Sequence, residues 1–151
     1  MYLSYEFCDS IADAYIPFLA GLSVVTFYIQ TRKAGLTRAI RSYGNLTISI
    51  VIAYALMALD QALKIWPRFG LDYSTHTALG LAFVMYLTLG VDKRSLQLGA
   101  VLSFLLYVGL ILFQQYHSPL DIITTAIVTA PLFAIKYRLS SSKALKVNQY
   151  A

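Results

Sequence analysis

Residues 96–115 read LQLGAVLSFLLYVGLILFQQ and contain no charged side chain. A helix rises about 1.5 Å per residue and the hydrocarbon core of a bilayer is about 30 Å thick, so a run of this length can cross it. The run is continuous and lacks the polar–apolar alternation of a membrane β-barrel strand. It therefore predicts a transmembrane helix.

Four other apolar stretches accompany this run. They cover residues 11–30, 46–66, 75–90 and 119–137. Three are long enough to cross a bilayer, whereas residues 75–90 form a shorter run with polar residues at both ends. We expect the first turn of this shorter helix to lie inside the protein, at a cavity below the membrane surface. The sequence thus predicts an all-α, polytopic membrane bundle of about five transmembrane helices.

The composition agrees with a membrane environment. Of the 151 residues, 58% are hydrophobic and 13% are charged, and the mean hydropathy is +0.64. Soluble domains are about 45–50% apolar and about 25% charged. A soluble fold of this size has too little interior to bury the additional apolar side chains of this chain. We expect one transmembrane domain over residues 1–139 and a short basic cytoplasmic tail over residues 140–151 that frays.

The charged residues are unevenly distributed over this topology. If the spans alternate, ten of the twelve basic residues and one acid fall on one side, which gives +9 there. Lys64, Arg68 and six acids fall on the other side, which gives −4. Because Lys and Arg are enriched in cytoplasmic loops, we expect the N-terminus outside and the C-terminus in the cytoplasm. The net charge of +5 then reflects topology, so the bilayer is the expected partner and nucleic acid is not.

Both histidines fall on the outer side, each at a predicted helix start. In residues 116–121, YHSPLD, Ser118, Pro119 and Asp121 fit the cap and first turn of a helix. Asp121 would then complement the helix dipole. The His-x-x-x-Asp spacing also lets the carboxylate orient His117 and leaves the other ring nitrogen free to attack an electrophile. Both interpretations fit this segment.

The second histidine segment is DYSTHT, residues 72–77. Ser74 or Thr75 fits a helix cap, with His76 as an interfacial polar residue. A helix N-terminus with free N–H groups also binds anions, and the small hydroxyl residues would allow a close approach. His76 would then lie at the edge of the anion site as a proton donor.

Three ionisable residues precede this segment. Lys64 and Arg68 fit interfacial side chains that extend to the headgroups, or a clamp on phosphate oxygens. Asp60 lies within an apolar span, where an ionisable residue is costly, and its spacing to Lys64 predicts an ion pair along the helix. The sequence offers no convincing set of metal ligands, and we expect no cofactor.

Taken together, the two histidine segments resemble the type-2 phosphatidic acid phosphatase superfamily, which includes sphingomyelin synthase-like lipid phosphotransferases. Residues 74–78 match its Pro-Ser-Gly-His element, with Tyr73 for the proline and Thr75 for the glycine. His117 and Asp121 match its His-x-x-x-Asp element, and the 41 residues from His76 to His117 are a typical separation. The resemblance covers about residues 64–134.

The chain departs from this family at three points. Lys64, Pro67 and Arg68 match the first family motif only in part. Leu110 and Ile111 occupy the positions of the usual Ser-Arg pair, so that phosphate-binding arginine is absent. Five spans are predicted where six are usual.

The resemblance implies a lipid phosphatase or phosphotransferase that acts on a lipid phosphate or diphosphate at the extracytoplasmic face. His117 would attack phosphorus to give a phosphohistidine, Asp121 would orient His117, and His76 would protonate the leaving group. Phosphate would be bound by Lys64, Arg68, Ser74 and Thr75. The alternative is a weakly active or inactive relative that binds phosphorylated headgroups or serves as an accessory subunit. A bacterial inner membrane is the expected location, and the sequence does not predict the oligomeric state.

Overall fold

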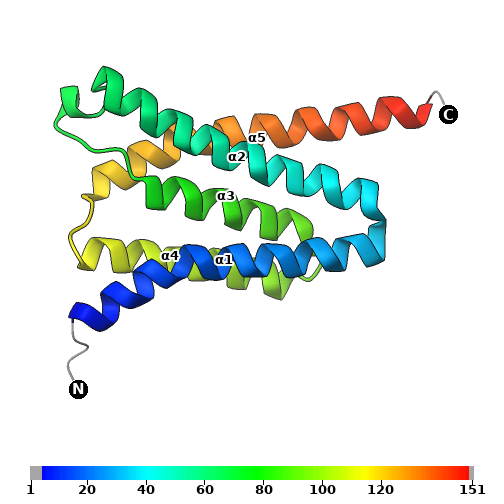
Figure 1. The fold of residues 1–151 in the computed structure, drawn as a ribbon, viewed down its shortest axis with the longest axis horizontal. Coiled ribbons are helices and arrows are strands. Elements are labelled where there is room, and N and C mark those ends of the chain that lie inside the picture. The colour runs from blue at the N-terminus through cyan, green and yellow to red at the C-terminus, as the bar shows by residue number, and fades with distance from the viewer. Residues whose placement is uncertain (1–4, 150–151) are drawn as a thin grey trace.

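The computed structural model describes residues 5–149 (Figure 1). The helices are α1 (Tyr5–Ala34), α2 (Leu36–Leu63), α3 (Thr75–Gly90), α4 (Arg94–Phe113) and α5 (Pro119–Gln149), with a 3-10 turn, η1 (Pro67–Phe69), before α3. Each of the five apolar stretches lies within one helix, apart from a few residues at the end of the second and fourth, and α1, α2 and α5 extend beyond the stretches they contain. The predicted all-α architecture is therefore confirmed for the described residues.

Four of the helices are long and apolar enough to cross a membrane. They are α1, α2, α4 and the segment Pro119–Ser140 of α5. Their outer faces carry large exposed apolar side chains, such as Phe18, Val51, Leu106 and Ile127. Lipid tails are as apolar as these side chains, so their exposure is favourable in a bilayer. The chain is therefore a helical membrane bundle.

The remaining apolar helix, α3, lies in the middle of the bundle (Figure 1). It contacts each of the other four long helices. A helix that is apolar on all sides is buried by its neighbours, and most α3 side chains are buried. Its 16 residues span only about 24 Å. The expectation that its first turn lies inside the protein holds for Ser74 and Thr77, which are buried, whereas His76 is exposed.

Two glycines hold α3 close to its neighbours. A Cβ atom at Gly80 would lie 2.8 Å from the ring of Phe104 on α4. A Cβ atom at Gly90 would lie 2.3 Å from the side-chain nitrogen of Gln30 on α1, which donates a hydrogen bond to the Gly90 carbonyl. Small residues at such positions let helix backbones approach closely in lipid.

The two ends of the bundle carry different residues. The start of α1 lies at the same end as the α2–α3 and α4–α5 connections, which hold both histidines (Figure 1). The other end holds the α1–α2 and α3–α4 connections, with Arg32, Lys33, Lys93 and Arg94. The helices therefore alternate in direction, as the sequence predicted.

One local prediction is wrong. Asp60 does not pair with Lys64, because α2 ends at Leu63 and Lys64 adopts a left-handed conformation with φ of 53°. The Asp60 carboxylate instead accepts the backbone N–H of Trp66 at 2.8 Å. In the predicted tail, the backbone of α5 continues as a helix to Gln149.

Candidate functional site

The start of α5 is closed by a reciprocal pair of hydrogen bonds. Ser118 Oγ accepts the backbone N–H of Asp121 at 3.3 Å, and Asp121 Oδ2 accepts the backbone N–H of Ser118 at 2.8 Å. Such a capping box satisfies N–H groups that have no partner within the helix. Pro119 takes the first helical position, where its missing N–H costs nothing. The predicted capping role of this segment is confirmed.

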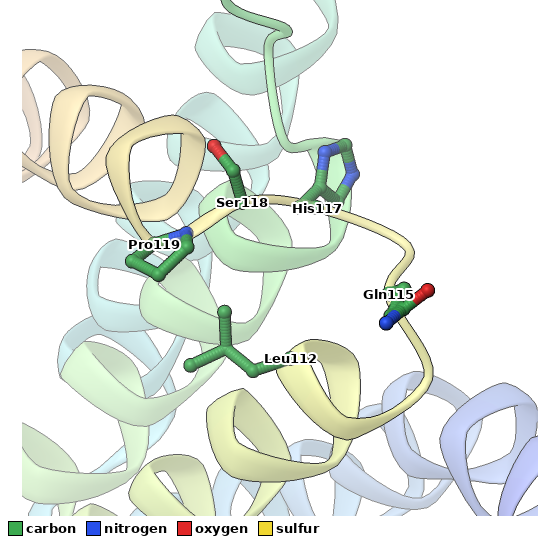
Figure 2. A pocket seen from close by; sticks show the side chains of 5 residues that line it. All are labelled: Leu112, Gln115, His117, Ser118 and Pro119. Atoms are coloured by element: carbon green, nitrogen blue, oxygen red, sulfur yellow. The ribbon is translucent and has the colours of Figure 1, made fainter.

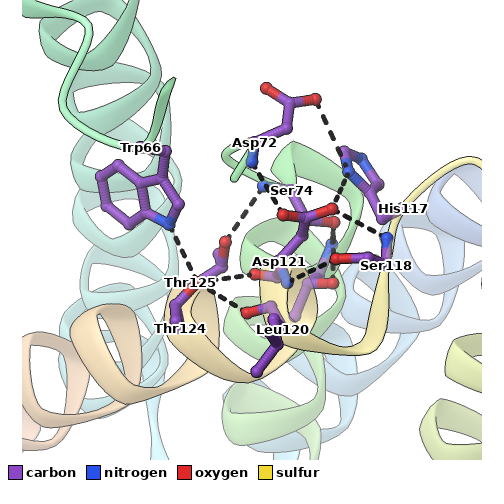
Figure 3. Close-up of polar contacts among 10 residues, drawn as sticks. Trp66, Asp72, Ser74, His117, Ser118, Leu120, Asp121, Thr124 and Thr125 are labelled. Atoms are coloured by element: carbon purple, nitrogen blue, oxygen red, sulfur yellow. Dashed lines mark hydrogen bonds and ion pairs between the residues drawn. The ribbon is translucent and has the colours of Figure 1, made fainter. Parts of the chain in front are cut away.

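Asp121 also ties α5 to the segment that enters α3 (Figure 3). Its Oδ1 accepts the backbone N–H of Asp72 at 2.7 Å. One helical turn further along α5, Thr125 Oγ1 accepts the backbone N–H of Ser74 at 3.0 Å. These two hydrogen bonds fix the starts of α3 and α5 relative to each other.

The start of α3 is capped by Ser74, one of its two predicted caps. Ser74 Oγ accepts the backbone N–H of Thr77 at 3.3 Å and lies 2.8 Å from the Thr77 hydroxyl. Within the described chain, the backbone N–H groups of Thr75 and His76 have no hydrogen-bond partner. They belong to the positive end of the helix dipole, where an anion is stabilised.

These caps bring the two histidines together. Their ring centroids lie 6.4 Å apart. The His117 side chain is only 10% exposed, and its Nδ1 is buried with no hydrogen-bond partner among the described residues. His76 is exposed, and its ring lies parallel to that of Tyr116 at a centroid distance of 6.3 Å. His76, His117 and Asp121 thus converge from two distant segments.

Two carboxylates lie beside the buried nitrogen of His117 (Figure 3). The Nδ1 atom is 3.6 Å from Asp72 Oδ2 and 4.0 Å from Asp121 Oδ2. Both distances are too long for a hydrogen bond, but either carboxylate can attract the ring when it is charged. Asp121 already accepts two backbone N–H groups, and Asp72 is the nearer carboxylate. Asp72 is therefore a site residue that the sequence did not single out.

The first helix adds two more acids at this end of the bundle. Asp9 accepts hydrogen bonds from the Tyr116 hydroxyl and, at 3.5 Å, from the Gln114 side-chain nitrogen. Asp13 lies close enough to His76 to act on it electrostatically. Neither acid was predicted as a site residue, because nothing in the local sequence indicates that α1 begins against the α4–α5 connection.

The two predicted phosphate-binding cations do not join this network. Lys64 follows the end of α2 and Arg68 lies in η1, and both are exposed. In the part of the chain that the structure describes, no ion pair or side-chain hydrogen bond links either residue to the histidine segments. The other two predicted phosphate-binding residues, Ser74 and Thr75, lie directly beside His76.

The α2–α3 connection is anchored on its inner side. Trp66 donates its backbone N–H to Asp60 and its indole N–H to Thr124 on α5, at 3.0 Å in the second case. The Tyr73 hydroxyl donates to the Ala53 carbonyl at 3.0 Å. Burial, with a smaller effect of the Asp60 carboxylate, raises the pKa of Tyr73 to about 12. The phenol therefore stays protonated at neutral pH and keeps this hydrogen bond.

A shallow pocket of about 370 Å³ opens beside His117. Figure 2 shows its lining residues, Leu112, Gln115, His117, Ser118 and Pro119. Leu112 and Pro119 supply apolar surface, while His117 and Gln115 supply polar groups. Apolar walls with a few polar groups suit a ligand that has both apolar and polar parts.

Neither a metal centre nor a known relative explains the site. Among the described residues, no group of three or more His, Cys, Asp or Glu side chains is placed to hold a metal ion. No family model, curated protein or solved structure matches the chain. The functional interpretation therefore depends on the residues of the site and their arrangement.

Proposed function

We propose that the protein is an integral-membrane lipid phosphatase or phosphotransferase with His117 as its nucleophile. The observation that carries this proposal is the convergence of His76, His117 and Asp121 at one end of a membrane bundle. The centroids of the two histidine rings are 6.4 Å apart, so the two side chains are near enough to act on the same small group. The resemblance of both segments to the phosphatidic acid phosphatase superfamily points to the same chemistry.

The reaction would proceed in two steps. His117 Nε2 would attack phosphorus as the bond to the leaving oxygen breaks, and His76 would donate a proton to that oxygen. The carboxylates of Asp72 and Asp121 beside Nδ1 would stabilise the positive ring of the phosphohistidine. Water or a lipid alcohol would then attack phosphorus as the bond between phosphorus and His117 Nε2 breaks, and its proton would go to His76, which lost a proton in the first step.

The negative charge of the phosphoryl group would be stabilised mainly by the N-terminus of α3. The N–H groups of Thr75 and His76 have no partner within the described chain, and stabilising phosphoryl oxygens is the main task in such reactions. Lys64 and Arg68 would add positive charge from their exposed positions. Their long side chains would close onto a bound phosphate rather than form the site in advance.

We further propose that all five long helices span the membrane, with the histidines on the extracytoplasmic side of a bacterial inner membrane. The basic connections at the opposite end support this orientation, because Lys and Arg are enriched in cytoplasmic loops. A lipid phosphate in the outer leaflet would then reach His117 from the side of the bundle, past Leu112 and Pro119.

Phosphate release from lipid phosphates by the purified protein tests this function. We expect His117→Ala to lower turnover by at least about 1,000-fold, because it removes the nucleophile. His76→Ala should lower turnover by about 100-fold or more, the usual contribution of a general acid. Ser95→Ala, at the opposite end of the bundle, is the matched control. Robust phosphate release by a folded His117→Ala variant would overturn the mechanism.

A second candidate function is favoured by the acidity of the site. Asp9, Asp13, Asp72 and Asp121 lie near the histidines, and among the described residues no Lys or Arg side chain pairs with them. A catalytically weak or inactive protein that binds phosphorylated headgroups, or serves as an accessory subunit, would tolerate this excess of negative charge beside the histidines. Binding of a lipid phosphate with no phosphate release in the same preparation would identify it.

A further inference from the structure

Two helices of the bundle end at left-handed residues that are not glycine. Among the described residues, a positive φ occurs at Gly35, Gly70, Lys64 and Gln115. Lys64 follows α2 and Gln115 lies two residues after the end of α4, so each precedes one of the histidine segments. A left-handed conformation strains a residue that has a Cβ atom, and strained residues cluster at functional sites. Lys64 already has a role in the proposed function, whereas Gln115 has none.

The backbone of Gln115 forms a turn that glycine usually forms. Its N–H donates to the Leu112 carbonyl at 3.1 Å, and the N–H of Tyr116 donates to the Ile111 carbonyl at 3.2 Å. These two hydrogen bonds around a left-handed residue, here with φ of 58°, are the Schellman motif, in which glycine is the most common choice. Glycine would make the same turn without a steric penalty. The turn alone therefore does not account for a glutamine at this position.

The side chain of Gln115 lines the pocket beside His117 (Figure 2). Its two neighbours in sequence, Gln114 and Tyr116, both donate hydrogen bonds to Asp9. Gln115 is exposed, and no hydrogen bond within the described chain holds its amide. A strained backbone thus presents a free amide in the same pocket as the buried histidine, which indicates a residue that binds a ligand.

The surroundings of this amide define what it can bind. It offers two N–H donors and one acceptor, and no lysine or arginine is among the lining residues of the pocket. A phosphoryl group at His117 presents oxygen atoms that accept hydrogen bonds, so the amide would act as the donor. A cationic side chain at this position would be drawn to the nearby Asp9 carboxylate, whereas a neutral amide is attracted less strongly and stays available.

We propose that Gln115 is a substrate-binding residue that donates an amide N–H to a phosphoryl oxygen of the lipid at His117. That the ligand is a lipid phosphate rests on the proposed function. Gln115 would hold the phosphoryl group from the α4 side, while the N-terminus of α3 would hold it from the other helix. The strain in the backbone then fixes the turn that places the amide and His117 in one pocket.

Binding of an analogue that cannot be hydrolysed tests this role. The analogue is a short-chain phosphatidic acid in which a methylene group replaces the oxygen between lipid and phosphorus, titrated calorimetrically into the purified protein in micelles. We expect Gln115→Ala to lower its affinity about 10-fold, because a hydrogen bond to a charged acceptor is lost. Gln115→Glu should lower it about 30-fold, because the carboxylate also repels the phosphonate. Both substitutions keep a Cβ atom and hence the backbone strain.

Gln61 provides the matched control for these substitutions. It is an exposed glutamine near the end of α2, at the same end of the bundle, and it does not line the pocket. Gln61→Ala and Gln61→Glu should each change the affinity for the analogue less than about twofold, because exposed charges at a distance are screened. Diacylglycerol with the same acyl chains, which lacks the phosphoryl group, should bind equally to all the variants.

Gln115→Gly separates the backbone from the side chain. Glycine relieves the left-handed strain, so we expect the midpoint of thermal unfolding to rise by about 2 °C. The affinity for the analogue should nevertheless fall about 10-fold, as in Gln115→Ala, because the amide is absent. A gain in stability together with a loss of binding is not expected of a residue with a purely structural role.

The outcomes separate this inference from the proposed function. Unchanged affinity for the analogue in Gln115→Ala and Gln115→Glu would overturn the role of Gln115, even if the protein releases phosphate from phosphatidic acid. A lower unfolding midpoint in Gln115→Gly would also overturn it, since glutamine would then serve stability. Failure of the proposed function would instead show as binding of the analogue that depends on Gln115, with no phosphate release from phosphatidic acid.

Discussion

The starts of α3 and α5 are built in opposite ways. At α3 the capping side chain of Ser74 is buried and the histidine, His76, is exposed. At α5 the capping residue Ser118 is exposed, and the His117 side chain is nine-tenths buried. Both helix starts contribute to one site and are tied together by hydrogen bonds from α5 to the backbone that enters α3.

This difference assigns different tasks to the two histidines. A buried imidazole has less freedom to move than an exposed one, and a nucleophile must be confined for attack in line with the leaving group. An exposed imidazole can regain a proton from water between turnovers, which a general acid requires. In the function proposed, His117 is therefore the nucleophile and His76 the proton donor.

The largest effect on this arrangement is expected from Asp121→Ala. The carboxylate accepts the N–H groups of Asp72 and Ser118, and alanine would leave both without their partner. Each of these part-buried hydrogen bonds has a charged acceptor, and such bonds contribute about 1.5–3 kcal/mol, so the free energy of unfolding should fall by about 3 kcal/mol. Unfolding in mixed detergent micelles can be followed by the fluorescence of Trp66, the only tryptophan, which is bonded to α5.

Asp121→Asn provides the matched control for this prediction. Its single carbonyl oxygen can still accept one of the two N–H groups, so we expect it to recover about half of the lost stability. A loss of less than about 1 kcal/mol in Asp121→Ala would show that the carboxylate does not hold the two helix starts together.

The fold was largely predictable because lipid imposes strict rules. A segment that crosses the hydrocarbon must be apolar and must satisfy its own backbone hydrogen bonds, so apolar runs in this chain coincide with helices. Residues 75–90 match α3 at both ends, where Ser74 and the charged residues after Gly90 mark the boundaries. The first apolar run, residues 11–30, is shorter than the helix that contains it, since α1 begins at Tyr5. Polar residues can continue a helix beyond the hydrocarbon, and an apolar run does not include them.

The site was predictable only where it depends on local spacing. Ser118 and Asp121 are three residues apart, and their reciprocal cap follows from that spacing. Asp72 takes its place beside His117 through a hydrogen bond to a residue 49 positions away, which no local pattern indicates. The predicted pair of Asp60 and Lys64 failed because the helix ends between them, and the i,i+4 geometry applies only within a helix.

A smaller effect is expected where α5 holds the buried cap of α3. Thr125→Val preserves the shape of the side chain but removes the oxygen that accepts the Ser74 N–H, and both residues are fully buried. We expect the free energy of unfolding to fall by about 2 kcal/mol. Thr124→Val, which removes the partner of the Trp66 indole on a more exposed face, should cost about 1 kcal/mol. If Thr125→Val and Thr124→Val lowered the free energy of unfolding equally, the buried hydrogen bond between Thr125 and Ser74 would have no special role.

The smallest effect is expected at the exposed cap of α5, which can be compared directly with the buried cap of α3. Ser118→Ala removes one exposed acceptor, and capping substitutions of this kind cost about 0.5–1 kcal/mol. Ser74→Ala removes a buried acceptor and its contact with the Thr77 hydroxyl, so it should cost about 1–2 kcal/mol. Thermal unfolding of the two variants side by side measures the difference. If Ser118→Ala proves as costly as Ser74→Ala, then burial does not distinguish the two helix starts.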